Sequence, residues 1–161
     1  MSIAQDFIAE LDYELPATRR LLERVPSDKG GWKPHPKSSA LGHLAQLVTR
    51  MPGTMVNIVR GIDLDLAAGP PYTLEPTETL LREFDAHVKD ARDVLRTAQD
   101  EDFALPWNLR YGDQVLDTGR RRDVFRNTIN HFVHHRGQLT VYLRLNDVPI
   151  PSLYGPTADE Q

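Results

Sequence analysis

The sequence predicts an all-α protein, a four-helix bundle with long crossover loops. Three observations support this prediction: four amphipathic segments with apolar residues at three- and four-residue intervals, no internal repeat, and no alternation of strand and helix patterns. The chain has 161 residues, of which 40% are hydrophobic, and this suffices for one core. We therefore expect a single domain over residues 1–161.

The first two helices are predicted from the spacing of their apolar residues. Apolar side chains form one stripe over residues 3–25, where Pro16 should bend or restart the helix because proline has no backbone N–H. After a loop rich in Pro, Gly and Ser, the second helix is expected over about 39 to 60. A second bend is expected at Pro52, and Gly61 should end this helix.

The second half of the chain predicts two further helices. The third is expected from Thr77 to Gln99 and the fourth over about 120 to 146. Between them, residues 111–113 read Tyr-Gly-Asp between short mixed runs, which indicates a small hairpin or an ordered loop. The tail after Pro149 is expected to be irregular. All three connections exceed the usual length in bundles, which favours crossovers or functional loops.

Composition excludes several classes of function. With 19 basic and 23 acidic residues, the net charge of −4 provides no field for nucleic acid or an anionic membrane. No apolar stretch approaches the roughly 20 residues of a membrane span, and the N-terminus lacks the features of a signal peptide, so we expect a cytoplasmic protein. Because the chain has no cysteine, any metal must be held by His, Asp or Glu.

The segment NHFVHHRGQL, residues 130–139, contains three histidines in five positions. On a helix, His131 and His135 lie one turn apart on the same side of the apolar stripe, where two imidazoles can converge on one ion. His134 points away and should be solvated. The same H-x-x-x-H spacing also fits an ordinary polar flank of a helix, so the pair alone does not decide between the two.

Two longer segments resemble the DinB/YfiT-like family: LLERVPSDKGGWKPHPKSSALGHLAQLV near the start and NHFVHHRGQLTVYLRLNDVPIPSLYGP near the end. The resemblance covers nearly the whole chain, and HHRGQL is its most specific part. It implies a bundle with long crossovers that is frequently dimeric, in which three histidines hold a divalent metal. Two of these histidines match His131 and His135. Relatives transfer low-molecular-weight thiols, act as maleylpyruvate isomerases or are presumed hydrolases.

The third histidine is where this sequence departs from the family pattern. The matching position in the second helix is occupied by Leu47. His43, one turn earlier, is our candidate for the third ligand, which gives a predicted metal set of His43, His131 and His135. His87 in the third helix is a rival, although a hydrogen-bonded interior histidine is the favoured interpretation there. His35, in the first loop, is expected to be structural or exposed.

A site of three imidazoles would suit Zn or Ni, with an open position for water or for a small-molecule substrate. Any thiol in such a reaction would have to be a cosubstrate. Gln138 could support the histidines or be a plain surface residue. The sequence leaves two hypotheses: a metal-dependent hydrolase or thiol S-transferase, and a metal-free bundle that lost its third ligand and acts as a binding or interaction module.

Three further expectations concern single residues and surfaces. Arg136 should form a semi-buried ion pair, with Asp85 or Asp90 as candidate partners, rather than anchor an anionic substrate. Trp32 and Trp107 should line the mouth of the cleft or cap the core. Apolar and aromatic residues near the C-terminus, namely Tyr142, Leu145, Val148 and the segment IPSLYGP, favour a homodimer.

Overall fold

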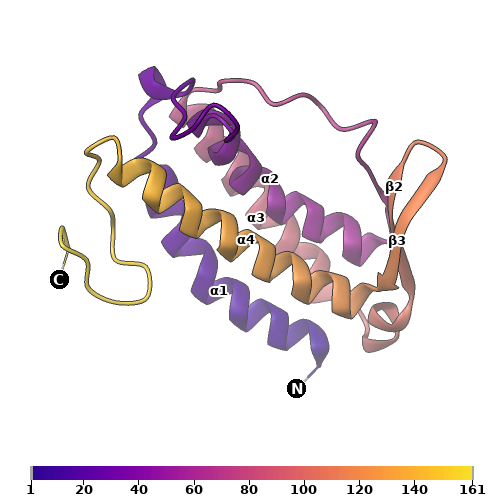
Figure 1. Cartoon of the computed structure of the whole chain (residues 1–161). Coiled ribbons are helices and arrows are strands. Elements are labelled where there is room, and N and C mark those ends of the chain that lie inside the picture. The colour runs from indigo at the N-terminus through magenta and orange to yellow at the C-terminus, as the bar shows by residue number, and fades with distance from the viewer. Residues whose placement is uncertain (1, 161) are drawn as a thin grey trace.

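The computed structural model describes residues 2–160; residues 1 and 161 of the predicted domain lie outside the described residues. Within this range four long helices form a bundle (Figure 1). They are α1 (Ile3–Leu22), α2 (Leu41–Arg60), α3 (Thr77–Thr97) and α4 (Arg121–Arg144). Helix α1 packs on α3 and α4, and α2 packs on the same two helices. Helices α1 and α2 therefore lie diagonally across the bundle, which requires a crossover between them.

Local sequence determines where these helices begin and end. Ser2 and Gln5 form a capping box that satisfies free backbone N–H groups at the start of α1. Gly61 ends α2 in the left-handed conformation, with φ of 72°. Helices α1 and α2 continue through Pro16 and Pro52, so neither proline ends its helix.

A small mixed sheet lies at one end of the bundle, and the all-α prediction is therefore wrong. Strand β1 (Leu64–Asp65) pairs in parallel with β2 (Pro106–Tyr111), which pairs in antiparallel fashion with β3 (Gln114–Arg120). The predicted hairpin is present, and Gly112 takes the positive φ of 58° that its turn requires. The remaining strand, β1, belongs to the α2–α3 connection. A strand of two residues is too short to show a periodicity in the sequence.

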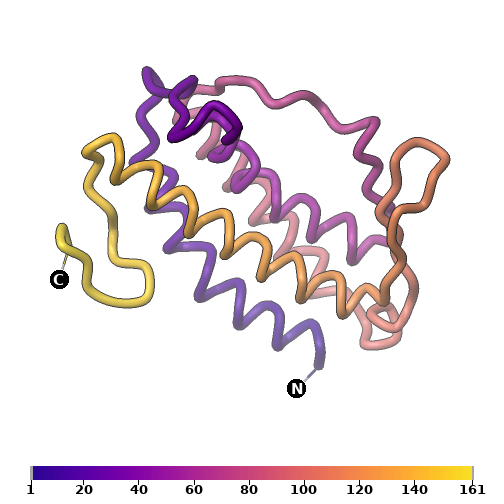
Figure 2. The backbone as a smooth tube through the Cα atoms, viewed as in Figure 1, coloured from indigo at the N-terminus to yellow at the C-terminus, as the bar shows by residue number. Residues whose placement is uncertain are grey.

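The long α2–α3 connection follows from the direction of the helices. Helices α2 and α3 run the same way, so residues 61–76 must return along the length of the bundle, as the backbone trace shows (Figure 2). Hydrogen bonds hold this strap, residues 66–76, onto α2. The Gln46 amide bonds to the backbone N–H and hydroxyl of Thr73, and Arg50 donates to the carbonyls of Pro70 and Pro71. The strap is thus a fixed wall of the molecule rather than a free linker.

The core lies between the four helices and is built from their apolar stripes. Phe7 stacks on Phe125 with ring centroids 4.3 Å apart, and it meets the edge of Phe103 at 5.6 Å. This contact joins α1 and α4 to the segment between α3 and β2. None of the helices in residues 2–160 is long and apolar enough to cross a membrane.

The C-terminal tail is irregular, as predicted, but it is tied to the bundle by ion pairs. Asp159 pairs with Arg144 of α4, and Glu160 pairs with Arg20 of α1. The predicted dimer surface is partly covered within the chain, because Tyr142 meets the edge of Trp32 at 5.7 Å. Leu145 is exposed. The homodimer stays a prediction.

Candidate functional site

A cavity of about 910 Å³ lies where α2, α4, the sheet and the strap meet. Its size falls in the range of small-molecule sites. Most of its lining is apolar; α4 contributes three neighbouring polar residues, Asn127, Thr128 and His131, while the charged residues come from α2 and the sheet. The lining residues that matter below are Leu47, Arg50, Met51, Thr54, Leu64, Asp65, Tyr72, Trp107, Leu109, Asp117, Gly119, Val124, Asn127, Thr128 and His131.

His131 and His135 form a hydrogen-bonded pair at the edge of this cavity. Their Nε2 atoms are 2.7 Å apart, and Nδ1 of His135 lies 2.8 Å from Oε1 of Gln138. The glutamine oxygen can only accept, so His135 carries its proton on Nδ1 and accepts through Nε2. His131 then donates from Nε2, which leaves its Nδ1 as an acceptor. Gln138 thus fixes the tautomers of both rings.

The pair favours the neutral form of His131. Burial lowers the pKa of His131, and the neighbouring His135 and His134 lower it further. The ring is therefore uncharged at neutral pH, the state in which an imidazole can accept a proton or bind a metal. His134 itself is exposed, as predicted.

In the part of the chain that the structure describes, no third protein ligand is placed beside the pair. Among residues 2–160, no three His, Asp or Glu side chains are placed to hold one metal ion. Leu47, at the position of the family's helix-two histidine, lines the same cavity as His131. His43 is partly buried one turn away and faces Tyr72, with ring centroids 6.1 Å apart. The residues present do not make up the three-histidine set that the resemblance implies.

The remaining histidines have structural partners. Nδ1 of His87 lies 3.1 Å from the carbonyl of Thr49, as favoured for an interior histidine. Gly53 makes room for this ring, because a Cβ there would lie 3.2 Å from it. Nδ1 of His35 accepts from the backbone N–H of Lys37 at 3.2 Å. Neither ring lines the cavity.

Arg136 is buried, as predicted, but the predicted partners are wrong. It pairs with Glu14 of α1, with Nη2 and Oε2 2.5 Å apart, while Asp85 pairs with Arg19. Arg136 also donates to Thr18 and to the hydroxyl of Tyr154. Helical periodicity predicted that Arg136 is buried. It could not predict which helix lies next to Arg136, because the crossovers determine which helices pack together.

Sequence analysis missed several residues of the cavity. Asn127 lies one turn before His131 on α4, so the i, i+4 spacing could have revealed it. Asp117 has no such signal, since its direction depends on the register of β3. Trp107 was predicted to line the mouth or cap the core, and it does both. It is 5% exposed, and its indole N–H donates to the carbonyl of Ile62 at 2.7 Å.

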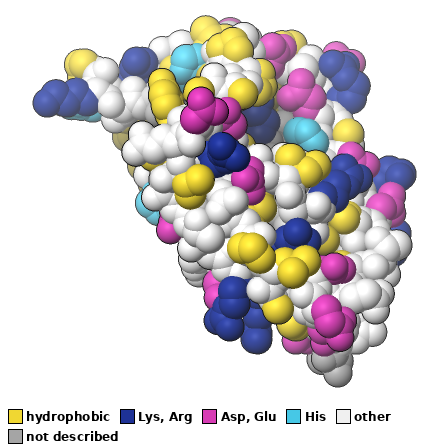
Figure 3. All heavy atoms as spheres, turned by 90° about the vertical axis from the view of Figure 1, so that its right-hand side faces the viewer, with side chains coloured by type: hydrophobic (Ala, Val, Ile, Leu, Met, Phe, Trp, Pro, Cys, Tyr) yellow, Lys and Arg dark blue, Asp and Glu magenta, His cyan; other side chains and the backbone are white. Residues whose placement is uncertain are grey.

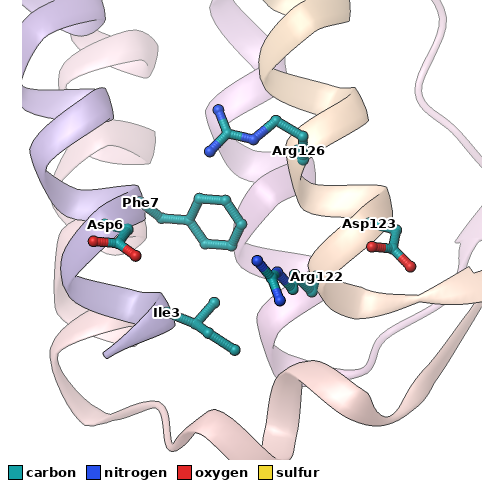
Figure 4. Close-up of a pocket in the computed structure, with 6 residues that line it drawn as sticks. All are labelled: Ile3, Asp6, Phe7, Arg122, Asp123 and Arg126. Atoms are coloured by element: carbon teal, nitrogen blue, oxygen red, sulfur yellow. The ribbon is translucent and has the colours of Figure 1, made fainter. Parts of the chain in front are cut away.

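A second, smaller pocket of about 240 Å³ lies between the first turns of α1 and α4 (Figure 4). Arg126 and Arg122 flank the ring of Phe7 there. The guanidinium of Arg126 stacks on Phe7 at 5.3 Å and pairs with Glu10, while Asp123 pairs with Arg120. These charges largely neutralise one another, so the pocket is a weaker candidate than the cavity.

The end of the molecule that carries the hairpin presents a mixed surface (Figure 3). Hydrophobic side chains lie there between acidic and basic ones. The exposed apolar residues of the sheet region are Ile62, Leu66, Leu105, Tyr111, Val115 and Leu116.

Comparison with known proteins assigns the family. A family model described as DinB family matches residues 72–161, which is more than half of the chain. The chain belongs to the DinB family. The predicted family is thereby confirmed, and the later of the two motif segments, which contains His131 and His135, lies within the matched residues. Among curated proteins, none matches the chain.

Two crystal structures of DinB-like proteins share the fold. One, from Bacillus cereus ATCC 10987, has a TM-score of 0.73 and 18% identity, over 93% of this chain and 97% of that one. The other, YjoA from Bacillus subtilis, has a TM-score of 0.66 and 18% identity, over 99% of both chains. At this identity the likeness extends to the fold alone.

Proposed function

We propose that this DinB-family protein binds a small, largely apolar molecule in the cavity between α2, α4 and the sheet, without a resident metal. The observation that carries this proposal is that Leu47 and His131 line the same cavity. A leucine at the ligand position removes a metal donor and adds apolar surface, which suits an organic molecule.

The polar groups of the cavity support the same conclusion. Asn127 and His131 present a row of hydrogen-bonding groups on α4, and Nδ1 of His131 is an acceptor that no residue of the described chain uses. Leu47 and Met51 of α2 and the indole of Trp107 line the same cavity. An apolar surface that faces a few convergent polar groups is typical of small-molecule sites.

Binding of 2-phenylethanol, followed by ¹H–¹⁵N NMR, tests this proposal. We expect shifts at the Trp107 indole and the Asn127 amide and none around Arg136. The variant Thr54→Trp places an indole in the cavity and should abolish binding. Thr97→Trp adds the same ring at an exposed site of α3 and should leave binding intact. Shifts that persist in Thr54→Trp would refute the proposal.

A metal-dependent enzyme is the second candidate function, as a hydrolase or as a thiol transferase with a thiol cosubstrate. It is favoured by one observation, the convergence of the Nε2 atoms of His131 and His135 at 2.7 Å. Zn or Ni would suit nitrogen ligands of this kind, with His131 and His135 supplied by the chain. Both candidates predict the same cavity for the substrate.

Metal content separates the two candidates. Protein purified without an affinity tag should be incubated with zinc or nickel and analysed for bound metal, as wild type, His43→Ala and His135→Ala. The metal-free proposal expects no stoichiometric metal in any of them. About one ion per chain in wild type, lost in His135→Ala, would instead support the enzyme. Loss in His43→Ala as well would identify His43 as the third ligand.

A further inference from the structure

The sheet forms one wall of the cavity, and its register decides which side chains face the ligand. Leu64, Leu109 and Asp117 are consecutive partners across β1, β2 and β3. Side chains directly opposite one another in a sheet point to the same face. All three line the cavity, and so does the neighbouring pair, Trp107 and Gly119. Asp117 is therefore a charged side chain among the apolar partners Leu64 and Leu109, and Asp65 of β1 is the second carboxylate of this wall.

A β-bulge gives Asp117 this direction. The register shifts between Leu109 and Arg110, where Leu116 of β3 has no partner on β2. Because successive side chains of a strand alternate between faces, one additional residue changes which side chains face the bundle. Gly119 leaves space at the next position, since a Cβ there would lie 2.8 Å from Val124.

The basic group of the cavity is already engaged. Arg50 donates to the carbonyls of Pro70 and Pro71 at 3.1 and 3.3 Å, and its guanidinium lies 5.1 Å from the ring centroid of Tyr72. These contacts hold the strap in place. An anionic ligand would have to break them to reach the guanidinium.

The acidic groups of the cavity are less fully engaged. Hydrogen bonds from the backbone N–H groups of Gly112 and Ala67 lower the pKa of Asp65, which is therefore ionised at neutral pH. Asp117 accepts one hydrogen bond, from the N–H of Thr118 to Oδ1 at 2.9 Å. Its second oxygen is free to accept from a ligand. Two carboxylates and one engaged arginine make the cavity unfavourable for anions.

We infer that the cavity selects an organic amine, whose ammonium group is held by Asp117 and whose apolar body lies against Leu47 and Trp107. The inference rests on the proposed function, because it names the class of molecule for the same cavity. Trp107 belongs to the neighbouring cross-strand pair on this face of the sheet, and its indole adds a π face that attracts cations. Asn127 and neutral His131 provide hydrogen-bonding groups without a competing charge.

Calorimetric titration with three probes of equal size tests the inference: 2-phenylethylamine, 2-phenylethanol and phenylacetate, at pH 7.5 and low salt. We expect the amine to bind about 10-fold more tightly than the alcohol, as for one charge-assisted contact. The acid should bind most weakly. Asp117→Asn should bring the amine to the affinity of the alcohol and leave the alcohol unchanged.

Asp113→Asn is the matched control, because Asp113 lies in the same hairpin but does not line the cavity. It should leave all three affinities unchanged. Any of three results would overturn the inference while the proposed function stands. These are equal binding of amine and alcohol, tighter binding of the acid, and an amine preference that persists in Asp117→Asn. If none of the three probes binds, both are wrong. Circular dichroism of each variant checks that it folds.

Discussion

Two polar clusters lie within one turn of each other on α4, but they differ in burial and in their hydrogen-bond partners. Arg136 is 1% exposed, and its partners Glu14, Thr18 and Tyr154 come from α1 and the tail. His131 and His135 lie on the other side of the helix, at the cavity, and bond to one another and to Gln138. The first cluster is complete within the chain, whereas the second leaves a nitrogen free.

This difference distinguishes a cluster that stabilises the fold from a cluster that can bind a ligand. A buried charge must be fully paired, because an unpaired one costs several kcal/mol, so the Arg136 cluster stabilises the fold. A partly satisfied polar group beside a cavity costs little, since water or a ligand can bond to it. Variants of the two clusters should therefore affect different measurements.

The largest effect is expected for Arg136→Met. It leaves the Glu14 carboxylate buried without its cation, and we expect a loss of about 3 to 5 kcal/mol in the free energy of unfolding, measured by urea denaturation. Arg144→Met is the control, because Arg144 pairs with Asp159 at the exposed surface. Its cost should stay below about 1 kcal/mol. Equal losses in the two variants would contradict the comparison.

Leu47→His should convert the histidine cluster into a metal site. A third imidazole in the same cavity completes the ligand set, and we expect zinc affinity to rise by at least about 10- to 100-fold. Competition with a chromophoric chelator measures the change. Leu47→Phe adds a ring without a donor nitrogen and should show no gain. If both variants bind zinc equally, Leu47 does not face the pair.

A smaller effect is expected for Tyr154→Phe. The Tyr154 hydroxyl accepts from Arg136 and donates to the Glu14 carboxylate, at 2.9 and 3.0 Å from its two oxygens. Its removal should lower the free energy of unfolding by about 1 to 2 kcal/mol. Tyr13→Phe, in the exposed ring stacked on Tyr154, should be neutral. A neutral Tyr154→Phe would mean that the tail is not held by this hydroxyl.

The smallest effect on stability is expected for His131→Gln, and it should depend on pH. Burial lowers the pKa of His131 below its usual value of 6.5, so below that pH the unfolded chain binds a proton that the folded chain does not. Wild-type stability should therefore fall as the pH falls from 7.5 to 5.5. His131→Gln should reduce this fall and change stability at pH 7.5 by only about 0.5 kcal/mol. A wild-type slope that is unchanged in His131→Gln would refute the assignment.

The sequence by itself determined the four helices, the hairpin turn and the polar face of α4. These features depend on the 3.6-residue period and on local turn chemistry, which act over a few residues. The same period separated the side of α4 that carries His131 and His135 from the side that carries Phe132, and it pointed His134 outward. The one-turn distance between His131 and His135 was likewise available from their spacing.

Only the tertiary structure decided which groups meet. The two-residue strand β1, the partner of Arg136 and the direction of Asp117 each depend on elements far apart in the sequence, brought together by crossovers and strand register. Leu47 was visible as a departure from the family pattern, but its place beside His131 required the packing of α2 on α4. Local periodicity determines the face of a helix on which a residue lies, whereas the topology of the whole chain determines what lies opposite that face.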